Sequence, residues 1–225
     1  MAIILNINTA FDNASVGVSI NGKVISELQS DSPKDHASFL QPAIKKLCAY
    51  NSIALKDIDA ISVINGPGSY TGLRVGLSSA KALCYVLQKP LILLNSLDVM
   101  ANALKIQSHT INPDVLFCPL IDARRMEVYT GLYNNELELI KNYSAEIVNE
   151  HFLKAERSTK PVIAGGNGSL KLQNIIPEDN ITYKNPLQLS LPAAILSAKA
   201  YANKNFASLA YSEPFYLKDV YFIKS

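Results

Sequence analysis

The residues best placed for chemistry lie in a glycine-rich turn between an apolar segment and a helical pattern. This turn, residues 65–72, has the sequence NGPGSYTG. Two glycines flank a proline there, so the backbone bends sharply and has a defined shape. Ser69 or Thr71 can cap the following helix, whose free N–H groups attract an anion such as phosphate. The Lys-Ser/Thr ending of a Walker loop is missing, which argues against a P-loop nucleotide hydrolase.

A second glycine pair follows an apolar segment in the second half of the chain. Together with the first turn, it predicts the remains of a nucleotide cleft. The simpler interpretation, which we favour, is a strand-to-helix turn that requires glycine. On the first interpretation, the residues predicted to contact a nucleotide are Asn8, Thr9, Ser69, Tyr70, Thr71, Gly165 and Gly166.

Groups that hold metals or act as nucleophiles are sparse. Histidine occurs only at His36, His109 and His151, with no pair three or four residues apart. One helix face therefore cannot present two imidazoles to an ion. Ser69 lacks the Gly-x-Ser-x-Gly surroundings of a nucleophile elbow and has no identifiable histidine partner. We expect no catalytic residue and no metal site.

The predicted helix after the turn carries a stripe of small residues. Gly72 and Gly76 are four residues apart, and each costs about 1 kcal/mol relative to alanine inside a helix. Close packing against another backbone recovers that cost. On one interpretation this backbone belongs to the chain's own sheet, and on a second it belongs to another subunit. On the second interpretation, the residues predicted to contact a partner or a second copy are His36, Phe39, Leu40, Ala43, Gly72, Val75, Gly76, Ser79 and Leu83.

Length and composition indicate a globular protein. The 225 residues suffice for one large or two small domains, and 48% hydrophobic with 18% charged residues fits a packed core. The net charge of +2 is too weak to indicate a nucleic-acid surface by itself. Cys48, Cys84 and Cys118 are far apart and odd in number, so we expect reduced thiols and a cytoplasmic protein. Neither a signal peptide nor a membrane span is predicted.

The first half of the chain predicts a three-stranded meander followed by helices and buried strands. Asn21 and Gly22 form a strong two-residue hairpin signal. Such a meander followed by a helix opens an actin-like, or ribonuclease H-like, α/β domain, by analogy of fold. The predicted strands are residues 3–8, 14–20, 23–29, 61–64 and 90–94, and the predicted helices are residues 35–50, 70–87 and 97–105.

Residues 107–114 show little periodicity, and we place a boundary there between domains 1–107 and 108–225. The second half repeats the strand-turn-strand opening without repeating its sequence. The expected architecture is two actin-like α/β domains, the second smaller and degenerate, with the last helix and tail free to pack back on the first. The elements predicted here are strands over residues 115–121, 126–133, 136–140 and 161–164, and a helix over residues 190–205.

Four segments resemble one known family. GPGSYTGLRVG, residues 66–76, is similar to the signature of the bacterial TsaB (YeaZ) family. DARRMEVY, residues 122–129, resembles its second signature, and residues 36–42 and 214–217 resemble its weaker ones. An eleven-residue match with fixed glycines is far more specific than a lone GxGxxG. The resemblance is global because the segments cover both halves in matching order.

The resemblance implies a non-catalytic subunit in the synthesis of threonylcarbamoyladenosine in tRNA. Its partners would be a TsaD-like catalytic subunit and a TsaE-like ATPase, with tRNA bound through the complex. Alone, the chain would form a homodimer. No cofactor of its own is implied, although ATP or ADP would bind at the joint between subunits. The catalytic family TsaD has a His-x-x-x-His pair after its counterpart of residues 91–94, whereas residues 95–100 here contain no histidine.

Two other functions stay open. An actin-like kinase or ATPase usually carries an aspartate at the end of its first strand, whereas Asn8 stands there and a neutral amide is a poor Mg²⁺ ligand. A direct RNA-binding module would use Arg124 and Arg125, which sit in a predicted hairpin turn, to contact phosphate. The near-neutral charge argues against that module, and solvated arginines explain the turn more simply.

Overall fold

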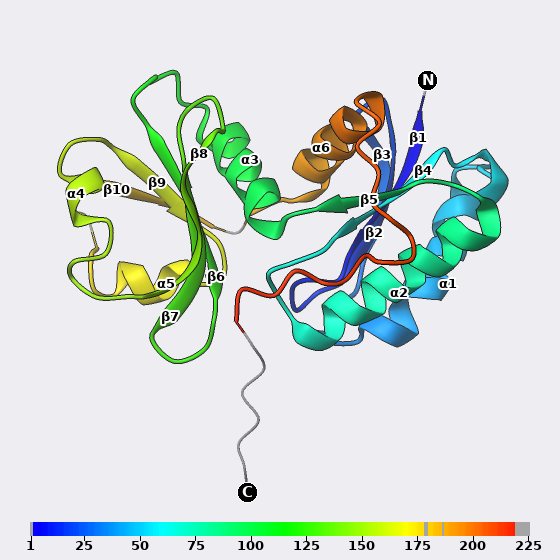
Figure 1. Ribbon diagram of the computed structural model, residues 1–225, viewed down its shortest axis with the longest axis horizontal. Coiled ribbons are helices and arrows are strands. Elements are labelled where there is room, and N and C mark those ends of the chain that lie inside the picture. The colour runs from blue at the N-terminus through cyan, green and yellow to red at the C-terminus, as the bar shows by residue number, and fades with distance from the viewer. Residues whose placement is uncertain (1, 178–179, 186, 219–225) are drawn as a thin grey trace, which may run out of the picture. The chain divides into compact units, whose positions relative to one another are not determined.

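The chain folds into two compact units (Figure 1), seen here in a computed structural model that describes residues 2–177, 180–185 and 187–218. Unit 1 takes the chain up to Val99 together with Gln188–Pro214, and unit 2 takes Met100–Leu187 and the tail from Phe215. The division differs from the predicted boundary after residue 107. The reason is that most of helix α3, Ser96–Ser108, belongs to unit 2. Helix α6, Ser190–Ala202, returns to unit 1, an arrangement that the prediction had allowed for the last helix.

Unit 1 is built on a five-stranded mixed sheet of order β3-β2-β1-β4-β5. The first three strands form an antiparallel meander, and β4 and β5 add in parallel. Parallel strands need a crossover connection, and the helices over residues 36–50 and 70–87 lie in these crossovers. The strands are β1 (Ile3–Asn8), β2 (Ser15–Ile20), β3 (Lys23–Gln29), β4 (Ala60–Ile64) and β5 (Leu91–Leu94).

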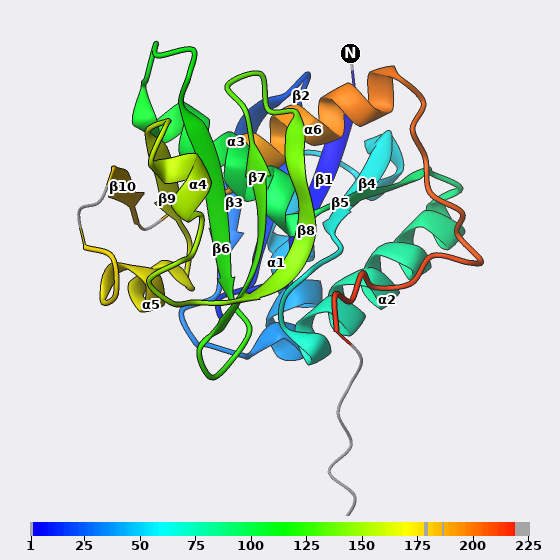
Figure 2. The same ribbon diagram turned by 60° about the vertical axis from the view of Figure 1, so that its left-hand side comes forward.

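Helices cover both faces of this sheet (Figure 2). Helices α1, His36–Tyr50, and α2, Tyr70–Leu87, pack on one face, and α6 packs on the other against β1, β3 and β5. Because side chains alternate along a strand, Leu5 joins the core under α1 and α2 while Ile4 joins the core under α6. A short 3₁₀ helix, Leu55–Asp57, precedes β4.

Unit 2 has a five-stranded sheet of order β10-β9-β6-β7-β8, with the same succession of an antiparallel meander and two parallel strands. Phe117 points into a core shared with α3, whereas Cys118 points into the core on the other face. The remaining elements are β6 (Leu116–Asp122), β7 (Glu127–Tyr133), β8 (Leu139–Ile147), β9 (Val162–Gly165), β10 (Ile181–Lys184), α4 (Lys154–Arg157) and α5 (Ser169–Gln173).

The structure confirms the predicted α/β class, with a smaller second unit whose helices α4 and α5 are short. The predicted strand 136–140 is wrong in extent, because β8 spans Leu139–Ile147. Strand β10 and helix α4 were not predicted. Among the described residues, no helix combines the length and the apolar character needed to cross a membrane.

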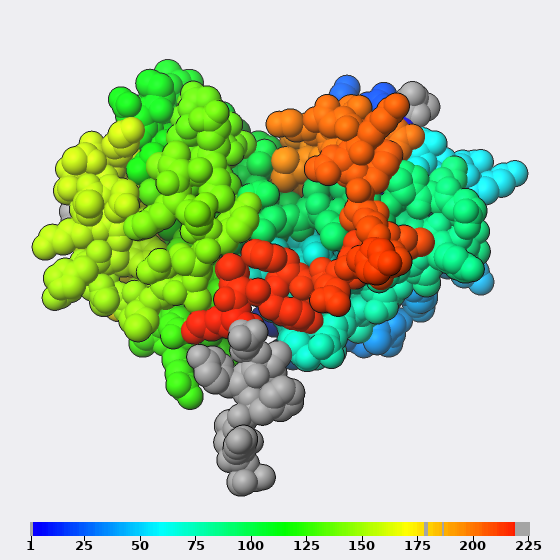
Figure 3. Space-filling view, viewed as in Figure 1, coloured from blue at the N-terminus to red at the C-terminus, as the bar shows by residue number. Residues whose placement is uncertain are grey.

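The segment after α6 is held on the surface of unit 1. The Ala207 amide donates to the Leu91 carbonyl at 2.9 Å, a single bridge to edge strand β5. Lys81 Nζ donates to the carbonyls of Ala210 and Ser212 at 3.3 and 3.1 Å. Figure 3 shows this segment in orange to red. Lys81 therefore holds this segment on unit 1 through two hydrogen bonds. The sequence alone did not predict this role.

Candidate functional site

The glycine-rich turn connects β4 to α2 and lies against the loop after β1. The Ser69 amide donates to the Ala10 carbonyl at 2.8 Å, and Ser69 Oγ accepts from the Gly72 amide at 3.3 Å. The predicted helix cap is therefore confirmed. A Cβ on Gly68 would lie 2.4 Å from the Ala10 carbonyl oxygen, so only glycine allows this approach. The turn has its shape because two loops of unit 1 pack backbone to backbone.

The small-residue stripe of α2 faces the chain's own sheet. Thr9 Oγ1 donates to the Gly72 carbonyl at 2.7 Å. A Cβ on Gly72 would lie 2.0 Å from the Thr9 carbonyl oxygen, and one on Gly76 would lie 2.2 Å from Thr9 Oγ1. Both glycines are buried. Of the two interpretations, close packing within the monomer is the one that the structure supports.

Several residues predicted to contact a partner are therefore not on the surface. The correction concerns those whose side chains or backbone lie in the core of unit 1: His36, Leu40, Ala43, Gly72 and Gly76. Four others, on α1 and α2, remain partly exposed: Phe39, Val75, Ser79 and Leu83. The helical pattern predicted both helices but not which side of each faces the core.

A different face of α2 meets solvent. We call it the outer ridge, and it combines small and apolar side chains at helical spacing: Val75, Ser78, Ser79, Ala82 and Val86. Val86 is 76% exposed and its neighbour Tyr85 is 70% exposed. Tyr50, at the end of α1, is 83% exposed. Exposed apolar surface of this kind on adjacent helices is typical of a protein-binding face.

His36 opens α1 and is only 3% exposed. Neither ring nitrogen has a hydrogen-bond partner among the described residues. A Cβ on Gly72 would lie 3.1 Å from the ring, so His36 fills the space that the glycine leaves. Burial lowers the pKa of His36, while the nearby charges of Asp12 and Asp35 oppose that shift less strongly. His36 is a neutral packing residue and not a surface contact.

The predicted nucleotide contacts fall in both units. In unit 1, Asn8 Oδ1 accepts from the Ala10 amide at 3.2 Å, so this side chain already serves its own loop. Thr71 is exposed, and the Tyr70 ring lies 4.1 Å from the Arg74 guanidinium carbon. The structure thus brings Thr9, Asn8 and the glycine-rich turn together on one side of β1 and β4.

Gly165 and Gly166 belong to unit 2, at the end of β9. A Cβ on Gly165 would lie 2.2 Å from the Lys184 carbonyl oxygen, and Gly166 has a φ of +114°. The Gly166 amide donates to Asn185 Oδ1 at 2.8 Å. Backbone packing therefore explains both glycines without a ligand.

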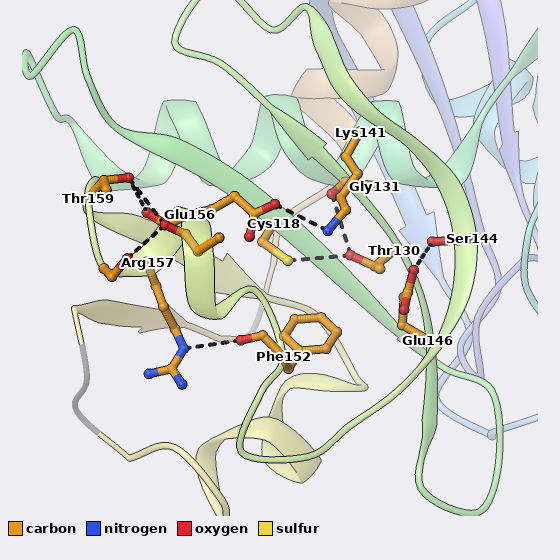
Figure 4. A network of polar contacts seen from close by, with 12 residues as sticks. Cys118, Thr130, Gly131, Lys141, Ser144, Glu146, Phe152, Glu156, Arg157 and Thr159 are labelled. Carbon is orange, nitrogen blue, oxygen red and sulfur yellow. Dashed lines mark hydrogen bonds and ion pairs between the residues drawn. The ribbon is translucent and has the colours of Figure 1, made fainter.

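A hollow of unit 2 lies beside β7 and β8, with a volume of about 250 Å³. Figure 4 shows a network of polar contacts that includes several of its lining residues, among them Thr130, Lys141 and Ser144. Cys118 Sγ lies 3.3 Å from Thr130 Oγ1, and Lys141 Nζ lies 3.2 Å from Glu156 Oε1. Burial raises the pKa of Cys118 to about 12, so this thiol is protonated and not a nucleophile. Within the described part of the chain, no three His, Cys, Asp or Glu side chains cluster as metal ligands would.

The hairpin between β6 and β7 has an unusual backbone. Arg124 and Arg125 have φ of +66° and +46°, a conformation that costs roughly 1–2 kcal/mol per residue other than glycine. The sequence marked these arginines as a hairpin turn but gave no sign of the left-handed backbone, because glycine or asparagine is the usual signal for it.

Comparison with known proteins identifies relatives along the whole chain. Residues 25–220 match the family model described as TsaD: tRNA N6-adenosine threonylcarbamoyltransferase. The tRNA threonylcarbamoyladenosine biosynthesis protein TsaB of Bacillus subtilis (strain 168) is 35% identical over 140 residues, which cover 61% of this chain and 58% of that protein. TsaB of Buchnera aphidicola subsp. Schizaphis graminum is 30% identical over 76% of this chain and 81% of its own. TsaB of Escherichia coli (strain K12) is 25% identical over 96% and 94%.

Solved structures support the fold. YeaZ from Pseudomonas aeruginosa superposes with a TM-score of 0.82 at 22% identity, covering 96% of this chain and all of that one. Component A of the (R)-2-hydroxyglutaryl-CoA dehydratase from Acidaminococcus fermentans gives 0.51 at 10% identity, covering 90% of this chain and all of that one. The predicted actin-like architecture is thereby confirmed. At these identities the likeness concerns the fold alone.

Proposed function

The chain belongs to the TsaB family, and from that premise we propose that it is the non-catalytic partner of a TsaD-like subunit. The complex would make threonylcarbamoyladenosine in tRNA, which is the biosynthesis that the relatives' names state. A TsaE-like ATPase would complete it, and the chain would meet tRNA as part of the complex in the cytoplasm. In the absence of its partner, the chain would form a homodimer.

The outer ridge of α2 carries this proposal. Its small side chains allow another helix to approach closely, and its apolar character favours burial in an interface. Phe39 of α1 and Val75 of the outer ridge are both half-buried and pack against the same core. We propose the TsaD-like subunit as the occupant of this face, with a second copy of the chain replacing it when the subunit is absent.

A non-catalytic role agrees with how the polar groups of unit 1 are used. Asn8 and Ser69, which would face a nucleotide in an active relative of this fold, hydrogen-bond to backbone of their own unit. The last residue of β1 is Asn8, so this end of the strand carries an amide and not an acidic side chain. We propose that this chain needs no cofactor of its own, and that ATP or ADP binds where it meets the catalytic subunit.

Reconstitution tests the proposal. Purified TsaD-like and TsaE-like subunits of the source organism should modify an unmodified tRNA transcript only when this chain is added. Ala82→Arg should abolish assembly and modification, because Ala82 is exposed on the outer ridge. Ala202→Arg is the matched control, since it adds the same charge to an exposed alanine at the end of α6.

Modification that proceeds equally well without the chain would remove the proposed function. Assembly that survives Ala82→Arg would instead show that the docking face lies elsewhere. A substitution at Gly76 cannot serve this test, because Gly76 is buried and its replacement would disturb the fold.

A further inference from the structure

The turn between β6 and β7 displays two adjacent arginines in a fixed geometry. Arg124 and Arg125 are both exposed. The Ala123 amide donates to the Glu127 carbonyl, and the Glu127 amide donates to the Arg124 carbonyl, each at 3.1 Å. The Arg124 amide donates to Asp122 Oδ1 at 2.6 Å. These bonds hold the backbone of the turn, while the guanidinium groups extend into solvent.

The nearest carboxylates are already neutralised by lysines. Asp122 Oδ1 lies 2.6 Å from Lys171 Nζ, and Glu127 forms an ion pair with Lys218. Among the described residues, neither Arg124 nor Arg125 takes part in an ion pair. The turn therefore presents two positive charges that no described carboxylate neutralises.

Folding alone does not account for these residue types. Two consecutive left-handed residues favour glycine or asparagine, and adjacent like charges repel each other. Arginine at both positions is unfavourable for the isolated chain, and a bound partner would supply a gain that offsets this cost. Strain of this kind at an exposed turn is common where a protein binds a ligand.

We propose that the Arg124–Arg125 turn binds the phosphodiester backbone of the tRNA within the assembled complex, an inference that rests on the proposed function. A guanidinium group donates two parallel hydrogen bonds to a phosphate, and two neighbouring guanidinium groups suit consecutive phosphates. An acidic protein surface is the less favoured partner. Met126 is the one exposed large apolar side chain of the turn, at 47% exposure, and does not form the apolar centre of a protein interface.

The test measures the affinity of the assembled complex for an unmodified tRNA transcript between about 50 and 200 mM salt. Arg124→Ala/Arg125→Ala should weaken binding about tenfold. It should also lower the slope of log affinity against log salt by roughly 0.7–0.9 for each phosphate that the variant no longer binds. The matched control is Lys154→Ala/Lys160→Ala, which removes two charges from exposed residues of the same unit and should change neither quantity.

Arg125→Gly separates binding from folding. Glycine relieves the left-handed strain, so this variant should have a higher Tm than the wild type and still bind tRNA more weakly. Unchanged tRNA affinity and salt slope in the double-alanine variant would overturn the proposal, because the arginines would then be merely solvated. Normal tRNA binding combined with weaker assembly would also overturn it, because the turn would then bind a protein.

Failure of the proposed function is a separate result. In that case the wild-type chain would not assemble with the TsaD-like subunit, and modification would not depend on it. The same salt titration on the wild-type and double-alanine chains alone would then decide whether the turn binds RNA, with equal affinities counting against it.

Discussion

At the scale of the residue, burial decides whether a polar side chain is a site or a part of the packing. His36, Asn8 and Thr9 all have chemistry that suits a ligand, yet His36 is enclosed and the other two hydrogen-bond to backbone groups of unit 1. The sequence could predict that Gly72 and Gly76 need a close neighbour, because glycine inside a helix has a known cost. It could not predict that the neighbour is Thr9, since that contact depends on tertiary packing.

His36 should make the stability of the chain depend on pH. Its folded pKa lies below its ordinary value because burial disfavours the charged ring. The unfolded chain therefore takes up the proton more readily. The contribution of neutral His36 to the free energy of unfolding is fully present above about pH 6.5. As the pH falls from that value through the folded pKa, this contribution is lost, at a rate of at most about 1.4 kcal/mol per pH unit.

Urea denaturation at pH 7.5 and at pH 5.5 checks this expectation. The wild-type free energy of unfolding should fall at the lower pH, and His36→Gln should show a smaller fall. His151→Gln is the matched control, because that side chain is 67% exposed and should leave the wild-type difference unchanged. An identical fall in wild type and His36→Gln would show that other groups carry the effect.

At the scale of the element, regular patterns were predictable and irregular ones were not. Strand β1 and helix α2 follow clear apolar and helical spacing, and their bounds agree with the prediction. Strand β8 was misplaced because its pairing with β7 shifts register twice, which interrupts the alternation that marks a strand. Strand β10 is only four residues long, and its parallel partner β9 is equally short.

Gly76→Ala should destabilise unit 1 although alanine is the better helix former. The new methyl group would lie 2.2 Å from Thr9 Oγ1. Overpacking of this kind costs about 1–3 kcal/mol, which outweighs the gain of about 1 kcal/mol in helix propensity. Chemical denaturation of the variant should report the loss as a lower midpoint.

Adding Thr9→Ala to Gly76→Ala should recover part of the loss, because it removes the hydroxyl that the methyl group meets. Ser78→Ala is the control, since Ser78 is exposed on the same helix and its replacement should leave the midpoint nearly unchanged. Equal stability of Gly76→Ala and the wild type would mean that the close approach between α2 and Thr9 is not required.

At the scale of the whole molecule, the two folding units are not two continuous halves of the chain. The sequence indicates a break near residues 107–114, where periodicity fades. Contacts place the division elsewhere: Ala101 and Leu104 of α3 pack with Phe117, whereas Ala193 of α6 packs under β1 and β4. These are contacts between distant parts of the chain, and composition does not encode them locally.

Unit 1 should therefore fold as a discontinuous segment pair and not as residues 1–107. A chain that joins residues 1–99 to 188–214 through a flexible linker of about ten glycines and serines retains α6 over its sheet. It should unfold cooperatively in urea, because both faces of the sheet are covered.

The fragment 1–107 leaves Ile4, Ile64 and Ile92 without the helix that buries them, and it exposes the apolar side of α3. It should lack a cooperative transition and bind a dye for exposed apolar surface. A sharp, equally stable transition in fragment 1–107 would show that α6 is dispensable, and that the N-terminal boundary indicated by composition is the physical one.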